Sequence, residues 1–468
     1  MKFTGIFNVK EKLYEEELIS APIVIWEYKD FKVDVHDRKR LLQIRTALAE
    51  ASDYAGAKIA NEIILELDHY EKRTCLDAFP VAIQVEHSSF CNARCIMCSH
   101  AITGNIGACN LQEEEFSKLK QLFPYSKEII LHGVGEPFLH PHIKEILDEY
   151  VKYEISVSGN TNGTVMNEEL ADTLGRNFTN LSVSCDASSK ETYERIRPGL
   201  KFETFILNVR LLRSKVPLLH LRMAVVAMRQ NLRELPDLIK MAADLDFDDV
   251  FITDVTTQSI LGNEEDDISL YPEVAGYYLN QAINAGKTYN IPVLIPEQLK
   301  KMAEEHVNVT SRVLANHSDA FKNEAFYHKL SEQYRKLSPA VTYIKADFDN
   351  LIQKSRYQCD GICDYILERP FIDAEGNVFL CCIDWLHCLG NLKENTFAEI
   401  WNGELLQAVR EMFYKGWIPK YCVGCIFLRN QIMCKRIKVI NMDDDFLQHN
   451  FNEAVNEIIE SQNLDKMK

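Results

Sequence analysis

The chain has 468 residues, of which 46% are hydrophobic and 26% are charged. This composition is typical of a soluble globular protein, and the length allows two or three domains. Its 52 Lys and Arg residues against 69 Asp and Glu residues give a formal net charge of −17. Because proteins that bind a phosphate backbone carry a basic footprint, we expect no nucleic-acid partner.

The start of the chain and its apolar runs predict neither secretion nor a membrane partner. Residues 1–5 lack the apolar core of a signal peptide, and runs such as 216–228 contain Arg and His and are too short to span a bilayer. We therefore expect a cytoplasmic protein. In a reducing compartment, its 14 cysteines are better suited to metal or redox chemistry than to disulfides.

Residues 1–78 are predicted to form a mainly helical N-terminal extension. Apolar residues at 23–26 and 31–33 predict a small hairpin. Between residues 37 and 69, apolar positions recur at helical spacing, which predicts an amphipathic helix broken near Gly56. We expect this extension to brace the domain that follows; peptide recognition is the alternative.

Residues 79–256 alternate between strand and helix patterns. Six strands are predicted, at 81–86, 128–132, 154–158, 181–185, 219–227 and 250–255. Parallel strands joined by right-handed helical crossovers form a barrel, so we predict an α/β fold with a partial (β/α)6 barrel. Barrel enzymes place their chemistry at the C-terminal ends of the strands.

Three cysteines, Cys91, Cys95 and Cys98, directly follow the first predicted strand. A four-iron, four-sulfur (4Fe-4S) cluster is fully ligated by four thiolates, so three of them leave one iron open to bind and reduce a ligand. Zinc is the alternative, but a structural zinc site needs four closed ligands. The nearest histidine, His100, lies two residues beyond Cys98.

A glycine-rich segment, Gly133-Val134-Gly135-Glu136-Pro137, ends the second predicted strand. Together with the cysteine spacing, it resembles the radical S-adenosylmethionine (SAM) enzymes. The resemblance implies that the three cysteines hold the cluster that cleaves SAM. It also implies contacts to the SAM amino group from Gly133, Gly135, Glu136 and Pro137. Glycines allow a ligand to approach the backbone closely, and a carboxylate suits an ammonium group.

The same resemblance implies further SAM contacts at other strand ends. Ser184 and Arg197 match the serine and arginine that contact the SAM carboxylate, with Arg195 as the alternative arginine. Asn162 follows the third strand, at the catalytic end. Met97 stands where relatives more often have an aromatic residue. A thioether can still pack on the adenine, so we expect the backbone contacts to SAM at this position to be kept.

Cys185 at the end of the fourth strand has two interpretations. It could donate a hydrogen atom to a substrate radical, which would give epimerisation. It could instead be a small apolar filler, as buried cysteines usually are. We favour the filler role, and therefore net oxidation of the substrate.

No catalytic motif is evident in residues 257–357, which we expect to be a mainly helical linker or insertion with helices at 272–286 and 298–336. Residues 358–440 carry a second cysteine pattern, formed by Cys363, Cys381, Cys422 and Cys425. This pattern resembles the SPASM domain, or its shorter twitch version. The resemblance implies that these cysteines hold an auxiliary 4Fe-4S cluster; structural zinc is the alternative.

The spacing after Cys425 favours one auxiliary cluster, because the next cysteine is Cys434, whereas a full SPASM domain continues with closely spaced cysteines and holds two clusters. Cys359, Cys382, Cys388 and Cys434 remain spare, so a second cluster is the alternative. Residues 441–468 are predicted to form a helical tail.

The resemblance implies a radical SAM oxidoreductase. An external one-electron reductant such as flavodoxin or ferredoxin would drive the cleavage of SAM to a 5′-deoxyadenosyl radical, which abstracts a hydrogen atom from a substrate carbon. We expect the substrate to be a natural-product-type small molecule of the aminosugar or cyclitol class. One alternative is a maturase that cross-links or epimerises ribosomal peptides or protein side chains. Another is an iron–sulfur electron carrier or scaffold.

Overall fold

The structure is a computed structural model that describes most of the chain. The described residues are 2–3, 24–98, 100–105, 107–255, 264–317, 344–345, 354–382, 387–423, 425 and 438–439. The helical predictions for 318–336 and for the tail 441–468 lie outside the described residues, as does Cys434.

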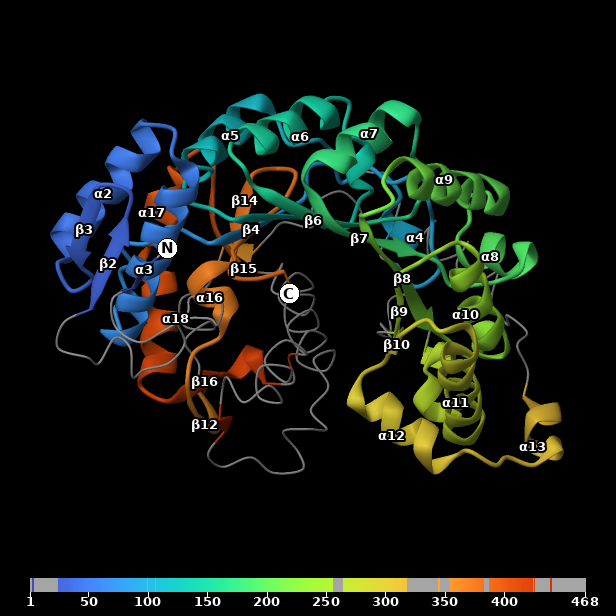
Figure 1. Ribbon diagram of the computed structural model, residues 1–468. Helices are drawn as coiled ribbons and strands as arrows, with labels where there is room; N and C mark the ends of the chain where they lie inside the picture. Colours follow the sequence, from blue (N-terminus) through green and yellow to red (C-terminus); the bar gives the residue numbers. More distant parts are fainter. Residues whose placement is uncertain are drawn as a thin grey trace, which may run out of the picture.

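Six parallel strands form the centre of the molecule, in the order in which they follow one another in the chain. They are β4 (Ala82–Val85), β5 (Glu128–Leu131), β6 (Ser156–Thr161), β7 (Phe178–Ser184), β8 (His220–Ala227) and β9 (Asp249–Asp254). Each pairs in parallel with its neighbour. The strands curve into an open arch (Figure 1), which confirms the predicted α/β fold with a partial barrel.

Helices cover the outer side of this arch (Figure 1). They are α5 (Glu113–Leu119), α6 (Ile143–Lys152), α7 (Glu168–Asn177), α8 (Lys190–Ile196), α9 (Phe202–Lys215) and α10 (Leu235–Asp244). In α6, the buried residues Ile143, Ile146, Leu147 and Tyr150 recur at helical spacing. In β8, buried and half-buried residues alternate. One face of the sheet therefore packs against the helices, and the other is the concave face of the arch.

The sheet continues beyond β4 into the C-terminal part of the chain. Strand β13 (Phe371–Ile372) pairs in parallel with β4, and β14 (Asn377–Phe379) and β15 (His387–Asn391) follow as antiparallel neighbours. With β10 (Val293–Leu294) and β11 (Ile344–Lys345) at its edges, the sheet has eleven strands. The sequence did not indicate this continuation.

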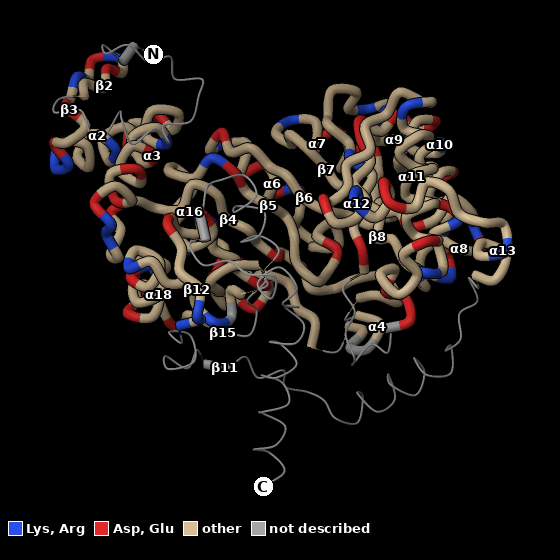
Figure 2. Tube along the Cα trace, turned by 90° about the horizontal axis from the view of Figure 1, so that it is seen from below, with Lys and Arg blue, Asp and Glu red and all other residues tan. Residues whose placement is uncertain are grey.

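The rest of the C-terminal part packs below one end of the arch (Figure 1). It contains a small sheet of β12 (Lys354–Asp360), β16 (Trp417–Pro419) and β17 (Lys438–Val439). Its helices are α16 (Asp364–Glu368), α17 (Phe397–Trp401) and α18 (Glu404–Tyr414). On the opposite side lie α11 (Pro272–Tyr289), α12 (Glu297–Glu305) and α13 (Ser311–Asn316), as Figures 1 and 2 both show.

The N-terminal extension begins with a sheet of β1 (Lys2–Phe3), β2 (Ile25–Tyr28) and β3 (Phe31–Asp34). Helices α2 (Arg38–Glu50) and α3 (Tyr54–Tyr70) follow. The predicted helix break lies at residues 51–53, and Gly56 is inside α3. A Cβ at Gly56 would lie 2.4 Å from the Tyr28 ring, so this glycine serves close packing and not the break.

The extension braces two parts of the molecule. The ammonium group of Lys58 donates to the carbonyl of Tyr153, at the end of α6, at 2.7 Å. The indole of Trp401 in α17 donates to the carbonyl of Ala78 at 3.3 Å. The extension thus contacts the C-terminal helices as well as the barrel. In the described part of the chain, no helix has the length and apolar character needed to cross a membrane.

Candidate active site

The three cysteines of the first motif lie on the loop between β4 and the short helix α4 (His100–Thr103). Backbone hydrogen bonds fix this loop: the N–H of Arg94 donates to Pro198 at 2.7 Å, and the N–H of Ile96 donates to Ile196 at 3.0 Å. Burial is the main cause that raises the pKa of Cys95 to about 12; the Arg197 guanidinium acts in the opposite direction, and negative charge on Cys98, Asp186 and Cys91 adds to the rise. The three sulfurs therefore lie close enough to influence one another.

The chemistry around the loop suits bound thiolates. The backbone N–H of Ala93 donates to the Cys91 sulfur at 3.4 Å, and the Arg197 guanidinium donates to the Cys95 sulfur at 3.7 Å. Among the described residues, no three His, Cys, Asp or Glu side chains meet at the spacing of ligands to a single metal ion. The site fits an iron–sulfur cluster because the three cysteines share one short loop, and because the sulfurs of Cys91 and Cys95 accept hydrogen bonds from nearby N–H groups.

The two glycines of the second motif are required by packing within the protein. A Cβ at Gly133 would lie 2.3 Å from the carboxylate of Glu86, and one at Gly135 would lie 2.1 Å from the carbonyl oxygen of Ser88. The glycines therefore let the chain after β4 approach the end of β5. The buried Pro137 opens the short helix η2 (Pro137–Leu139) directly behind them.

Glu136 is buried, and its carboxylate bridges to the end of β6. It accepts hydrogen bonds from the Thr161 hydroxyl at 2.8 Å and from the Asn162 N–H at 2.7 Å. Burial raises its pKa to about 7, although these hydrogen bonds act in the opposite direction. The structure thus gives Glu136 a role in joining β5 to β6, and its contact to the SAM amino group stays a prediction.

Glu86, at the end of β4, was missed by the sequence analysis. One carboxylate oxygen accepts from the N–H groups of Val134 and Gly135, the latter at 3.1 Å, and the other accepts from Ala374 of the β13–β14 hairpin at 3.5 Å. Burial raises its pKa to about 7. Its position as a charged last residue of a predicted strand was a usable signal.

Arg197 forms a buried ion pair with a carboxylate of the protein. Its guanidinium lies 2.6 Å from the carboxylate of Asp186, and both side chains are buried. Sequence analysis missed Asp186, which follows the end of β7. The alternative arginine, Arg195, donates to Gln230 at 3.4 Å. Ser184 is half-buried at the C-terminal end of β7, as predicted from its position.

Met97 belongs to a small apolar cluster that is separate from the main core. It packs with Val226 against four buried residues, which come from the cysteine loop, the end of α8 and the ends of two strands: Ile96, Ile196, Met228 and Val255. Such a surface beside the cysteine loop is suited to a flat aromatic ring. Contact with the adenine of SAM stays a prediction for Met97.

Cys185 is fully buried on the core side of the sheet. It continues the row of Leu181 and Val183, and its thiol donates to the carbonyl of Ala187 at 3.3 Å. This placement supports the packing role and gives no support to a hydrogen-donor role.

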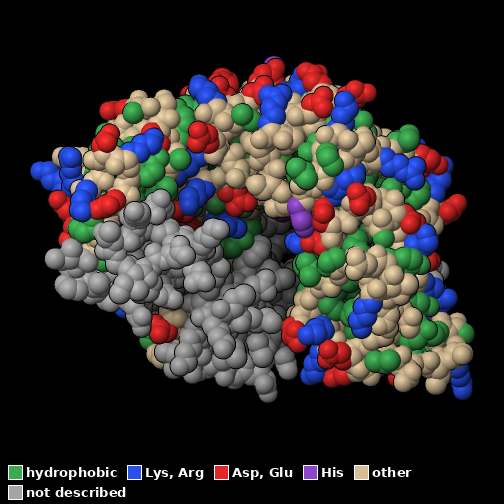
Figure 3. Space-filling view, viewed as in Figure 1, with side chains coloured by type: hydrophobic (Ala, Val, Ile, Leu, Met, Phe, Trp, Pro, Cys, Tyr) green, Lys and Arg blue, Asp and Glu red, His purple; other side chains and the backbone are tan. Residues whose placement is uncertain are grey.

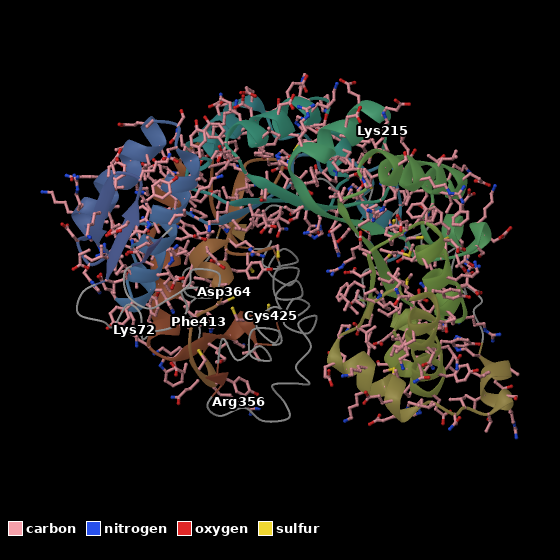
Figure 4. The ribbon with its side chains drawn as sticks, viewed as in Figure 1. Lys72, Lys215, Arg356, Asp364, Phe413 and Cys425 are labelled. Atoms are coloured by element: carbon pink, nitrogen blue, oxygen red, sulfur yellow. The ribbon has the colours of Figure 1, made fainter. Side chains whose placement is uncertain are left out.

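The four predicted auxiliary ligands lie in the C-terminal part. Figure 4 shows Cys425 in the same region as Asp364, which opens α16 directly after Cys363, and as Phe413 of α18. Burial, together with negative charge on Cys425, raises the pKa of Cys382 to about 12. The structure therefore brings Cys382, the neighbour of the predicted ligand Cys381, close to this group. No described cysteine forms a disulfide.

Figure 3 shows the molecule hollowed beneath the strands, on the concave face of the arch. His132 and Asn160 are both exposed there, and the Asn160 amide donates to Nδ1 of His132 at 3.0 Å. A separate cavity of about 620 Å³, lined by Phe116, His140 and Glu145 among others, lies outside the arch beside α5 and α6. It contains none of the predicted site residues.

The comparisons with known proteins agree with this arrangement. Residues 85–242 match the radical SAM superfamily, and residues 363–426 match SPASM, an iron-sulfur cluster-binding domain. The chain therefore has a radical SAM domain followed by a C-terminal SPASM domain. Its cofactors are SAM, a 4Fe-4S cluster and an auxiliary iron–sulfur cluster.

Two curated relatives cover most of the chain. The AdoMet-dependent heme synthase of Methanosarcina barkeri is 25% identical over 74% of this chain and 91% of its own length. A cofactor-modifying protein for the tungsten-containing aldehyde ferredoxin oxidoreductase of Pyrococcus furiosus is 22% identical over 77% and 90%. Among solved structures, SuiB of Streptococcus suis bound to S-adenosylmethionine gives a TM-score of 0.48 at 13% identity, covering 81% of this chain and 79% of SuiB.

Proposed function

We propose that this radical SAM enzyme is an oxidoreductase that removes a hydrogen atom from a carbon of a small, hydroxyl-rich molecule of the aminosugar or cyclitol class. The observation that carries the proposal is the set of neutral hydrogen-bonding side chains on neighbouring strands at the concave face of the barrel. The reaction would be a net two-electron oxidation.

Side chains that can pair with hydroxyl groups line this face on successive strands. The register places Ser158 beside Asn180 and Asn160 beside Ser182. The Nδ1 atom of His132 accepts from Asn160, so the ring carries its proton on Nε2 as a donor. Neutral donors and acceptors of this kind suit sugar hydroxyls, because each can be matched without burying an unpaired charge.

The charges of the face argue against a substrate with many carboxylates. Arg222 is the only Lys or Arg in strands β4 to β9, all of which the structure describes. Its guanidinium is bound by both carboxylate oxygens of Asp249, at 2.6 and 2.8 Å. Since a tetrapyrrole carries several carboxylates, it needs cations that these strands do not provide.

Each part of the proposed mechanism has candidate residues in this chain. Cys91, Cys95 and Cys98 would hold the cluster, and Glu136, Ser184 and Arg197 would position SAM. When bound, these cofactors supply a 5′-deoxyadenosyl radical that takes a hydrogen atom, and the auxiliary cluster supplies a nearby electron acceptor. The protein orients the substrate carbon from the concave face and limits the access of water. An external one-electron donor, such as flavodoxin or ferredoxin, would reduce the enzyme.

Deuterium transfer tests the substrate class directly. The reconstituted enzyme is incubated anaerobically with SAM, dithionite and either deuterated aminosugars and cyclitols or deuterated peptides. We expect deuterium in 5′-deoxyadenosine with the hydroxylated molecules. Transfer from peptides alone would favour the maturase alternative. Failure to form any 5′-deoxyadenosine would favour an electron carrier or scaffold.

A further inference from the structure

The main chain places Arg197 opposite Cys95. The two backbone hydrogen bonds from Arg94 to Pro198 and from Ile96 to Ile196 lie on either side of this pair. The close approach continues at Gly199, which has a φ of +97°, and a Cβ there would lie 2.6 Å from the carbonyl oxygen of Asn92. The segment after α8 is therefore fitted against the cysteine loop by its backbone.

The Arg197 side chain spans from this loop to Asp186. One terminal nitrogen lies 3.7 Å from the Cys95 sulfur, and the other lies 2.6 Å from Oδ2 of Asp186. The contact to Asp186 is an ion pair without the alignment of a hydrogen bond. Arg197 is 6% exposed and Asp186 is fully buried, so both charges are shielded from water.

Asp186 is itself fixed to the end of β8. Its Oδ1 accepts from the N–H of Val226 at 2.8 Å, and its backbone carbonyl accepts from the Asn231 amide at 2.9 Å. A guanidinium keeps its positive charge in proteins. The structure therefore holds a permanent buried cation at a set position beside one cluster-binding sulfur.

We propose that Arg197, positioned by Asp186, raises the reduction potential of the cluster bound at Cys95. Reduction adds a negative charge to a cluster, and hydrogen bonds to its sulfurs are among the features that set its potential. A buried cation stabilises added negative charge more strongly than an exposed one, because the surroundings screen it less. This role differs from contact with the SAM carboxylate, and it is independent of the substrate.

The test is an anaerobic redox titration of the reconstituted protein without SAM, followed by electron paramagnetic resonance. The Cys95→Ala variant retains only the auxiliary cluster and so identifies its signal. The other signal of the parent then belongs to the cluster bound at Cys95, and its potential can be followed. For Arg197→Gln, we expect at least a tenfold loss in the stability of the reduced state, which corresponds to a potential about 59 mV more negative for one electron.

Arg94→Gln is the matched control, because it removes a charge from the same loop. The Arg94 guanidinium donates to the carbonyls of Cys91 and Ala93, at 3.0 and 2.7 Å. We expect a smaller shift for this variant than for Arg197→Gln. Arg197→Lys keeps the charge but not the fork of donors, and it should give an intermediate potential.

Arg197→Gln leaves Asp186 buried and unpaired, which could prevent folding. The double variant Arg197→Gln/Asp186→Asn removes both charges, and it should still have a more negative potential than the parent. An unchanged SAM-free potential in a folded, cluster-loaded variant that has lost only SAM affinity would overturn the inference. Absence of any cluster at Cys95 in the parent would overturn it together with the proposed ligand set.

Discussion

The amide of Asn162, at the end of β6, donates to the side-chain oxygen of Asn92 in the cysteine loop at 2.8 Å. Asn92 in turn donates to the hydroxyl of Thr164 at 2.9 Å. These bonds connect the loop after β4 with the loop after β6. They tether the proposed cluster site to a strand that is not its neighbour in the sheet.

Replacement of Asn162 by Ala should loosen this tether without removing a cluster ligand. Loss of this partly buried hydrogen bond costs on the order of 1 kcal/mol, so we expect cluster iron to be released to a chelator roughly five times faster. Asn160→Ala is the control, because Asn160 contacts His132 and not the loop. Equal release rates in the two variants would contradict a role for the tether.

Iron content should identify the auxiliary ligands. The reconstituted parent should hold about eight irons per chain, in two four-iron clusters. We expect Cys381→Ala to hold about four and Cys382→Ala to hold about eight, because only Cys381 matches the ligand pattern. The reverse result would make Cys382 the ligand. Zinc in place of iron in a Cys91/Cys95/Cys98→Ala triple variant would show a structural zinc site.

Cys185→Ala should leave turnover largely intact, because the thiol lies in the core and not on the concave face. The variant tests oxidation against epimerisation when the reaction is run in deuterated water. We expect no solvent deuterium at carbon in the product. Loss of product in the variant, with solvent deuterium in the parent's product, would show that Cys185 is a hydrogen donor.

The buried carboxyl of Glu136 should make the stability of the cluster-free protein depend on pH. Its folded-state pKa of about 7 lies above the ordinary value of 4.5, so the folded chain holds this proton more tightly. The stabilisation is complete below the ordinary value and is lost as pH rises through 7, at up to about 1.4 kcal/mol per pH unit.

We therefore expect the melting temperature to fall more steeply between pH 5 and 8 in the parent than in Glu136→Gln. The control is Glu404→Gln, at the exposed start of α18, which should follow the parent. Parallel curves for the parent and Glu136→Gln would contradict the raised pKa.

The sequence was sufficient for the parts of the fold and site that depend on local patterns. Alternating apolar residues identified the barrel strands, and their ends located the cysteine loop and the segment at Glu136. The end of β6 was harder: the predicted strand stopped at 158, because Gly159 and Asn160 have the composition of a turn, whereas β6 continues to Thr161. Gly159 pairs with Leu131 of β5, and a Cβ at Gly159 would lie 2.8 Å from the carbonyl oxygen of Leu131.

Contacts between distant segments could not be predicted. The bond from Ala374 to Glu86 joins residues 288 positions apart, and that between Trp401 and Ala78 spans 323. The pairing of β13 with β4 depends on such contacts, because β13 has only two residues and no periodic pattern of its own. Asp186 was visible as a charge at a strand end, but its partner Arg197 could be assigned only from the folded chain.

The central claim is that the cysteine loop after β4 supports reductive cleavage of SAM. The most direct measurement is 5′-deoxyadenosine formed by the reconstituted protein with SAM and dithionite under anaerobic conditions. We predict formation by the parent and by Cys75→Ala, which alters an exposed cysteine outside the loop, and none by Cys91→Ala, Cys95→Ala or Cys98→Ala. Formation at the parent rate by any of those three variants, or none by the parent, would contradict the account.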